Sequence, residues 1–216
     1  MCGRYTITNK DVSDHFGAEQ GSFDFAPSYN VAPTQQVPIV LERKGERVMT
    51  LAKWGLLPSW VKEPKAFKAS MFNARSESAS EKASFKGPLC YKRAIVPASG
   101  FYEWLRGDGK AKTPHYIQLS GGKPIGFAGL YDLWNDEVLS CTILTTNPND
   151  LMATLHDRMP VILAPDDYDR WLDPSVTDPA EIQDLLRPYP GEMTAHVVST
   201  AVNSPKNNAP ELTRAA

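Results

Sequence analysis

The chain has 216 residues, of which 42% are hydrophobic and 22% are charged, with a formal net charge of −2 at pH 7. This composition predicts one domain over residues 1–216, with its core at about 2–208 and a short C-terminal tail. The absence of an apolar run of about 18 residues excludes a transmembrane helix, and charged residues near the start predict no secretory signal. Cysteines at positions 2, 90 and 141 have no metal-ligand spacing and indicate a reducing cytoplasm.

Most of the predicted elements are short extended runs separated by proline and glycine. Val37–Leu41 and Val48–Trp54 form a predicted hairpin with a turn at Lys44-Gly45. Phe101–Leu105 is expected to pair with His115–Leu119 across Gly107-Asp108-Gly109. Further strands are predicted at Leu89–Val96, Ile125–Tyr131, Leu139–Thr145, Val161–Leu163 and Thr194–Ser199, and Cys90 and Cys141 fall in such runs as buried small hydrophobic residues.

Helical segments are fewer and shorter. They are predicted around Ser76–Ala83, at Asp150–Leu155 with Asn149 as the N-cap, at Asp166–Leu172 and at Ala180–Leu186. The sequence therefore predicts an α+β fold: a β-rich single domain with a strongly curved or barrel-like, mostly antiparallel sheet and peripheral short helices.

Charge is distributed unevenly along the chain. Residues 40–112 hold 15 Lys/Arg and 7 Asp/Glu, whereas residues 113–216 hold 6 and 14. Such asymmetry favours a basic face for a polyanion, although charges from the two halves also mix if the halves interleave in the fold.

Cys2 carries chemistry that no internal residue can offer. Removal of Met1 is favoured by a small second residue and would leave an α-amine and a thiol on one residue. The amine has a pKa near 7.7–8 and the thiol one of about 8.5, so we expect a useful neutral-amine fraction and a few per cent of thiolate. An aldehyde would form an imine with this amine, and the sulfur could then close a thiazolidine ring.

Several other segments have residue types that suit a binding site better than a core. They are Tyr29-Asn30-Val31-Ala32-Pro33, Trp54-Gly55-Leu56-Leu57-Pro58-Ser59-Trp60, Phe72-Asn73-Ala74-Arg75-Ser76-Glu77, Gly100-Phe101-Tyr102-Glu103-Trp104 and Leu155-His156-Asp157-Arg158-Met159-Pro160. Together with Met1-Cys2-Gly3-Arg4-Tyr5 and the closing Val198–Asn207 segment, they closely resemble the SOS response-associated peptidase (SRAP) family. The resemblance runs from residue 2 to about residue 208.

The resemblance implies a protein that crosslinks itself to abasic sites in single-stranded DNA. In that family the N-terminal cysteine forms a thiazolidine with the ring-opened sugar, and an Asn, a Glu and a His complete the site. By motif, these residues fall on Cys2, Asn73, Glu103 and His156. No metal or cofactor is expected. The implied partner is single-stranded DNA with abasic sites, including junctions with duplex, bound by a cytoplasmic monomer that associates with the nucleoid.

The residue chemistry agrees with these roles. Glu103 lies between two aromatic residues, and an apolar setting keeps a carboxyl group protonated for general acid catalysis of sugar opening. His156 can hold or release a proton near neutral pH, and the Asn73 amide can orient the Cys2 amine. Each also has an ordinary structural interpretation: an outward-facing strand residue for Glu103, and helix caps for His156 and Asn73.

DNA contacts are expected from residues near these motifs. Arg4 and Arg75 suit phosphate clamps, and Trp54 and Trp60 suit stacking on bases, with core burial as the alternative for both indoles. Asn30 is expected to support the pocket. Weaker phosphate candidates are Lys53, Lys62, Lys65 and Lys68.

Three other functions remain open from the sequence. A class II amidotransferase also begins Met-Cys-Gly, but its oxyanion and glutamine-site motifs are not found in register here. A thiol protease that removes its own leading residues would use Cys2 with Glu103 and His156 as acid–base partners. A non-enzymatic nucleic-acid-binding module would use the basic segment alone.

Overall fold

The computed structural model describes residues 2–8, 12–67, 69–106 and 112–216. Its strands are β1 (Tyr5–Ile7), β2 (Glu19–Gln20), β3 (Ser28–Val31), β4 (Gln36–Arg43), β5 (Glu46–Trp54), β6 (Asn73–Arg75), β7 (Arg93–Ala98), β8 (Gly100–Arg106), β9 (Lys112–Leu119), β10 (Ile125–Trp134), β11 (Val138–Thr146), β12 (Met159–Pro160), β13 (Ile162–Leu163) and β14 (Met193–Val197). Its α-helices are α1 (Val12–His15), α2 (Ser76–Ala79), α3 (Ala83–Tyr91), α4 (Asp150–Ala153) and α5 (Tyr168–Leu172). Short 3₁₀ helices occupy Ser120–Gly122, Pro165–Asp167, Pro179–Leu185, Thr200–Asn203 and Pro210–Thr213.

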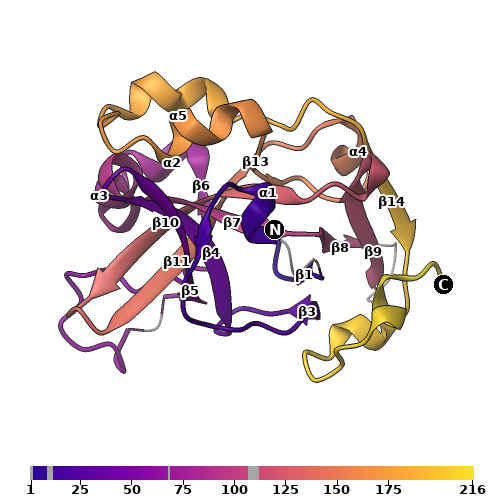
Figure 1. Cartoon of the computed structure of the whole chain (residues 1–216). Helices are drawn as coiled ribbons and strands as arrows, with labels where there is room; N and C mark the ends of the chain where they lie inside the picture. Colours follow the sequence, from indigo (N-terminus) through magenta and orange to yellow (C-terminus); the bar gives the residue numbers. More distant parts are fainter. Residues whose placement is uncertain (1, 9–11, 68, 107–111) are drawn as a thin grey trace.

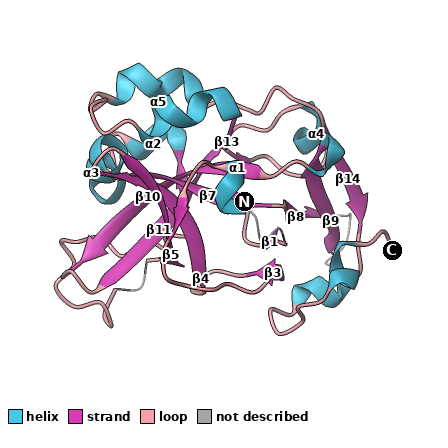
Figure 2. Ribbon diagram, in the orientation of Figure 1, coloured by secondary structure: helices cyan, strands magenta, loops and turns pink. Residues whose placement is uncertain are grey.

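Five of the strands close into a barrel. Antiparallel pairing runs in the order β5, β4, β7, β10, β11, and a parallel contact between β11 and β5 completes the ring at Ser140–Lys53 and Cys141–Trp54. A second sheet has the order β14, β9, β8, β1, β3. Figure 2 shows the helices around the outside of these strands. The predicted fold class, β-rich with a barrel-like and mostly antiparallel sheet, is confirmed.

Local turn chemistry accounts for the two barrel hairpins. Lys44 and Gly45 between β4 and β5 have φ values of 54° and 85°, and Asn135 and Asp136 between β10 and β11 have 51° and 55°. Two successive positive φ angles match the twist of the flanking strands. The predicted hairpin at Lys44-Gly45 is therefore confirmed. The pairing of β8 with β9 is also as predicted, while the Gly107-Asp108-Gly109 turn lies outside the described residues.

One predicted strand is partly wrong. Leu89–Tyr91 end helix α3, and only Arg93–Ala98 form a strand. The segment buries Leu89 and half-buries Phe85, four positions apart, which is helical spacing that a short apolar run does not reveal. Cys90 is consequently a half-buried helix residue, whereas Cys141 in β11 is fully buried as predicted.

The other predicted elements are found with small shifts in their bounds. The segment around Ser76–Ala83 is divided between α2 and the start of α3, and Ala180–Leu186 is a 3₁₀ helix. Asn149 caps α4 by accepting a hydrogen bond from the Met152 backbone. Within the described part of the chain, no helix is both long and apolar enough to span a bilayer.

Strand β1 joins the second sheet to the barrel core. Its neighbours in the sheet are β3 and β8, and Figure 1 shows it between the barrel strands and β9 with β14. The Tyr5 ring packs edge-on against Trp54 and Phe127 of the barrel, at centroid distances of 5.1 and 6.0 Å. The residues just before Tyr5 are therefore fixed at the boundary between the two sheets.

Candidate active site

The Cys2 backbone is held by a barrel residue. The side-chain amide of Asn73 donates a 2.7 Å hydrogen bond to the Cys2 carbonyl, and β6, which carries Asn73, pairs in parallel with β11. The Cys2 side chain is fully buried, and its thiol lies 3.7 Å from the Arg4 carbonyl. Asn73 is therefore a contact of Cys2 itself, and helix α2 begins only after Arg75, whose side chain makes no capping hydrogen bond.

The Cys2 thiol is less acidic than the sequence suggested. Burial, and secondly the negative charge of Glu103, raise the pKa of Cys2 to about 12. The expectation of a few per cent thiolate at neutral pH is therefore wrong for the chain as described. A group with this pKa reacts as a thiol that must give up its proton when the sulfur forms a bond.

Glu103 is a buried carboxylate on β8. It is 3% exposed, so the alternative of an outward-facing strand residue is excluded. Its Oε1 accepts a hydrogen bond of 3.3 Å from the Trp104 backbone and lies 4.0 Å from Nε2 of His156. The charge of this carboxylate also acts on the Cys2 thiol. Glu103 thus acts electrostatically on the thiol and lies 4.0 Å from the imidazole.

His156 lies in the loop that follows α4. Its backbone amide bonds to the Met152 carbonyl, which fixes the end of the helix. Its Nδ1 lies 3.0 Å from the backbone amide of Arg158 and 2.7 Å from Oδ1 of Asp157. The ring is thereby oriented with Nε2 toward Glu103.

Glu103 and His156 line a pocket of about 430 Å³. Its wall includes Gly3, next to Cys2, and the full lining is Gly3, Phe72, Arg75, Glu103, Trp104, Lys112, His156, Asp157 and Arg158. Glu103 and His156 are part of this lining. Cys2 adjoins it through Gly3, and Asn73 lies in the sequence between the lining residues Phe72 and Arg75. The cavity is lined by the Glu103 carboxyl group and the His156 imidazole, with the cationic side chains of Arg75 and Lys112 in the same wall, and the buried Cys2 thiol is one residue from the lining residue Gly3.

Arg158 is a pocket residue that the sequence analysis did not single out. It is buried and makes a double hydrogen bond to Glu77, at 2.7 and 2.8 Å, and a further one to the Thr145 carbonyl. Glu77 in turn has a lowered pKa, first because of this hydrogen bond. Sequence position could have indicated both residues, since Arg158 comes directly after His156-Asp157 and Glu77 comes two positions after Arg75, each beside a candidate site residue.

Arg4 has internal partners. Its guanidinium donates to Oδ1 of Asn30 at 2.9 Å and to the Val202 and Asn203 carbonyls at 2.8 and 3.3 Å. Asn30 is buried and donates to the Val202, Ser204 and Asn207 carbonyls. Arg4 and Asn30 therefore tie the C-terminal segment to β1 and β3. A phosphate clamp by Arg4 would have to break some of these bonds.

The C-terminal end of the chain is packed against the second sheet. Leu212 is 4% exposed and belongs to a small core with Tyr102, Tyr116, Val198 and Val202, and Ala215 forms a bridge with Val198. The short tail expected after residue 208 is thus part of the folded unit.

The two candidate stacking tryptophans have opposite environments. Trp54 is fully buried and donates to the Phe72 carbonyl at 2.8 Å, so the expectation that it stacks on bases is wrong in this structure. Trp60 is 57% exposed and packs edge-on against Phe67 at 6.1 Å.

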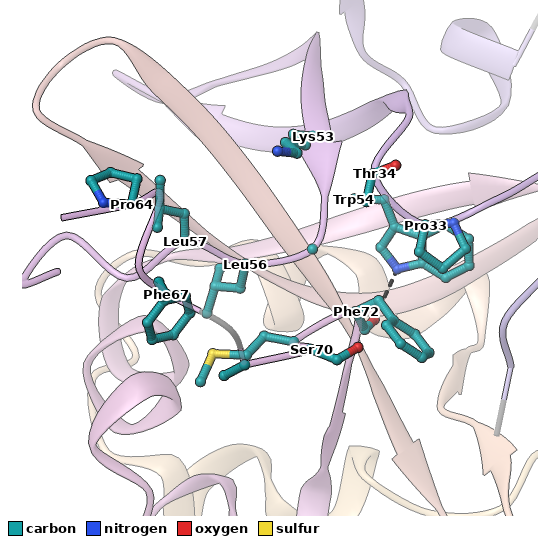
Figure 3. A pocket seen from close by; sticks show the side chains of 13 residues that line it. Pro33, Thr34, Lys53, Trp54, Leu56, Leu57, Pro64, Phe67, Ser70 and Phe72 are labelled. Atoms are coloured by element: carbon teal, nitrogen blue, oxygen red, sulfur yellow. Dashed lines mark hydrogen bonds between the residues drawn. The ribbon is translucent and has the colours of Figure 1, made fainter.

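Beside Trp60 lies a second pocket of about 320 Å³. Figure 3 shows Pro33, Trp54 and Phe72 on one side and Leu57, Pro64 and Phe67 on the other, with Lys53 above. Because Phe72 lines both pockets, they are neighbours. Lys53, Lys62 and Lys65 are exposed, and Lys68 lies outside the described residues.

The loop that carries Trp60 is held on both sides by the β10–β11 hairpin. The Ser59 amide donates to Oδ2 of buried Asp132 at 2.7 Å, and Nε1 of Trp134 donates to the Val61 carbonyl at 2.7 Å. Lys92 forms an ion pair with the other oxygen of Asp132, 2.5 Å away. The backbone on each side of Trp60 is therefore held by hydrogen bonds, while the Trp60 ring is exposed.

The fold and the site together define a β-barrel protein with a buried cysteine at position 2 and a glutamate and a histidine 4.0 Å apart in the adjoining pocket. The model of the family described as "SOS response associated peptidase (SRAP)" matches residues 1–205. The chain belongs to this family.

Named relatives and solved structures agree with the family. The abasic site processing protein YoqW of Bacillus subtilis is 45% identical over 98% of each chain. The abasic site processing protein HMCES of Xenopus tropicalis is 35% identical over 87% of this chain and 65% of its own length. A crystal structure of a Bacteroides thetaiotaomicron protein superposes with a TM-score of 0.88 at 28% identity, covering both chains completely. One from Bordetella bronchiseptica gives 0.79 at 27% identity, covering 92% of this chain and all of the other.

Proposed function

We propose that this chain processes abasic sites in DNA by forming a thiazolidine between Cys2, freed by removal of Met1, and the ring-opened sugar. The observation that carries the proposal is the placement of Cys2 between two partners. Asn73 holds its carbonyl at 2.7 Å, and Glu103, whose charge acts on its thiol, lies 4.0 Å from His156 in the adjoining pocket. The relatives named for abasic site processing support the same function.

The proposed reaction begins with opening of the sugar. Glu103 or His156 donates a proton to the ring oxygen as the C1′ hydroxyl loses its own, which gives the free aldehyde and a 4′ hydroxyl. The neutral Cys2 amine adds to C1′, and the carbinolamine loses water after protonation of its hydroxyl. An imine results, with its nitrogen on Cys2.

Ring closure follows from the state of the thiol. With a pKa raised to about 12, the Cys2 sulfur keeps its proton until the imine carbon is within reach. The sulfur then bonds to C1′, its proton passes to the Glu103 carboxylate, and the imine nitrogen gains a proton to become a secondary amine. The net change is one aldehyde and one aminothiol converted to a thiazolidine and one water. Reversal through the same groups is slow.

The DNA path in this proposal crosses Phe72. The sugar occupies the pocket with Glu103 and His156, a flanking nucleotide occupies the second pocket, and Trp60 stacks on a base beyond it. Arg75 is exposed at the pocket edge and suits a phosphate. Single strands, including those at junctions, are favoured because reaching C1′ in duplex requires unstacking that costs a few kcal/mol.

The experiment uses two matched oligonucleotides, one with an abasic site and one with a tetrahydrofuran analogue that lacks the aldehyde. The wild-type chain should bind both and form a heat-stable adduct only with the first. Cys2→Ala should abolish the adduct and Cys2→Ser should nearly do so, because oxygen closes a much less stable ring. An adduct at wild-type yield from Cys2→Ala, or none from the wild type, would overturn the proposal.

A salt series tests the binding step separately. With about three to five phosphates contacted, the slope of log K against log salt for single strands is about −2 to −3.5. Glutamine hydrolysis in place of an adduct would indicate amidotransferase chemistry, and salt-dependent binding without any adduct would indicate a binding module. Incubation of the purified Met1-bearing chain alone tests whether it removes Met1 itself.

A further inference from the structure

Glu103 is buried, yet the proposed reaction requires it to exchange protons more than once. It is 3% exposed, so direct exchange of its proton with solvent is restricted. His156 lies next to it, with Nε2 4.0 Å from Oε1 and a side chain that is 19% exposed. Asp157 lies on the other side of the ring, with Oδ1 2.7 Å from Nδ1 and a side chain that is 83% exposed. The three groups form a row from the interior to the surface.

The two neighbours of His156 Nδ1 require opposite protonation states of this nitrogen. The backbone N–H of Arg158, 3.0 Å away, is a donor and needs the lone pair of Nδ1. The Asp157 carboxylate, 2.7 Å away, is an acceptor and needs a proton on Nδ1. One protonation state cannot satisfy both neighbours. The site therefore provides a partner for Nδ1 in each of two states of the ring.

We propose that Asp157 is the outer member of a proton relay that connects Glu103 to solvent through His156. This inference rests on the proposed function. In the resting ring, Nδ1 accepts from Arg158 and Nε2 carries the proton. A proton from solvent then adds to Nδ1, where Asp157 stabilises the resulting imidazolium.

The relay proceeds by transfer of the Nε2 proton to the Glu103 carboxylate. The ring is left neutral, with its proton on Nδ1 facing Asp157 and with Nε2 as the nitrogen whose lone pair can accept a proton. That lone pair takes the next proton released by Glu103, and the Nδ1 proton leaves to solvent beside Asp157. The N–O separation of 4.0 Å must close by about 1 Å for direct transfer, or be bridged by one water.

Other charged groups near the ring do not duplicate Asp157. Arg75 and Lys112 line the same pocket as cations, and the Arg158 guanidinium is bonded to Glu77. Among the described residues of this pocket, Asp157 and Glu103 are the carboxylates, and Asp157 is the exposed one. Asp157 is thus a positioning residue that acts through His156.

The test compares three variants in single-turnover crosslinking to an abasic single strand from pH 5 to 9. Asp157→Asn keeps the shape of the side chain, Asp157→Ala leaves space for a small carboxylate, and Asp150→Asn removes the same charge from an exposed position at the start of α4. Both Asp157 variants should react about 5- to 50-fold more slowly near neutral pH, which is less than the about 10²–10⁴-fold expected for loss of the acid–base group itself, because Asp157 acts through His156. Their DNA affinity should be equal to or above that of the wild type. Formate should restore the rate of Asp157→Ala, and Asp150→Asn should behave as wild type.

Nitrogen NMR of the His156 ring gives a readout that does not depend on crosslinking. At a fixed pH near 6.5, the fraction of rings with a proton on Nδ1 should be smaller in Asp157→Asn than in the wild type. If the wild type forms no adduct, the proposed function fails and this spectrum alone decides on the relay. The relay is wrong if Asp157→Asn keeps the wild-type Nδ1 proton fraction, or if a crosslinking wild type is matched by Asp157→Ala in rate, pH profile and formate response.

Discussion

The side-chain amide of Asn73 holds the backbone carbonyl of Cys2 at 2.7 Å across 71 positions of the sequence. Because β6 pairs with β11 of the closed barrel, this amide is attached to the barrel. The position of the first residues therefore depends on the barrel and on β1 together.

Replacement of Asn73 tests that relationship. Asn73→Ala removes a hydrogen bond with a net value of about 1 kcal/mol, so single-turnover crosslinking should slow by about 5- to 10-fold. Asn73→Asp should be slower still, because a carboxylate oxygen would then face the Cys2 carbonyl. DNA affinity should be unchanged in both variants. An Asn73→Asp protein that reacts as fast as wild type would show that this contact does not position Cys2.

Glu103→Gln keeps the shape of the side chain and removes its titration. Crosslinking should slow by about 10²–10⁴-fold, the usual range for general acid–base catalysis, with DNA affinity nearly unchanged. Reversal of a preformed adduct should slow as well, since it uses the same proton path. The measurement is single-turnover crosslinking from pH 5 to 9. A Gln variant with the wild-type rate and pH profile would make Glu103 a structural residue only.

The support of Trp60 leads to a graded prediction for DNA binding. Trp60→Ala should weaken binding to undamaged single strands by about 1–3 kcal/mol, the range for one stacked base. Trp134→Phe should cause a smaller loss, because it removes only the hydrogen bond to the Val61 carbonyl.

Trp171→Phe is the matched control for this series. It removes an equivalent hydrogen bond, from Nε1 to the Ala94 carbonyl, in the core beneath α5. It should lower the melting temperature without changing DNA affinity, measured by fluorescence anisotropy. Equal DNA affinity in Trp134→Phe and the wild type would mean that the hairpin does not support the stacking ring.

Alkaline conditions should destabilise the barrel through Cys141. Burial raises the pKa of this thiol to about 12, whereas in the unfolded chain it is about 8.5. The folded state therefore holds the proton more tightly, so the stability it contributes is present below pH 8.5 and is lost as the pH rises toward 12. Between pH 8 and 10 this one group lowers the free energy of unfolding by about 2 kcal/mol.

Denaturant unfolding of Cys141→Ala at these two pH values isolates that contribution. The variant should lose about 2 kcal/mol less stability than the wild type between pH 8 and 10. Val37→Ala removes buried volume but no titrating group and should follow the wild-type pH dependence. An identical pH dependence in Cys141→Ala and wild type would contradict the assigned burial effect.

The hairpins and the β-rich class could be predicted because they depend on local chemistry. Lys44-Gly45 provides the positive φ angles of a tight turn, and short apolar, β-branched runs mark the flanking strands. The contact that closes the barrel could not be predicted, because the parallel pairing of Cys141 with Trp54 joins strands far apart in sequence. Helix α3 was missed because a short apolar run has the same appearance in a helix and a strand.

The candidate site shows the same limits. Cys2, Asn73, Glu103 and His156 were assigned through family resemblance, and the structure adds the contacts between them. Two partners of Arg4 were not visible in sequence, because they are the backbone carbonyls of Val202 and Asn203, almost 200 residues away. The raised pKa of the Cys2 thiol likewise depends on burial, which composition near the terminus does not reveal.

The central claim is that the α-amine nitrogen and the sulfur of Cys2, freed by removal of Met1, both bond to C1′ of the sugar. The mass of the intact adduct tests this claim most directly. The adduct with an abasic single strand should weigh as much as the chain beginning at Cys2 plus the oligonucleotide, less one water. It should be unchanged by borohydride, because no imine remains after the sulfur has closed the ring. An adduct that retains Met1, or one that borohydride reduces, would contradict the account.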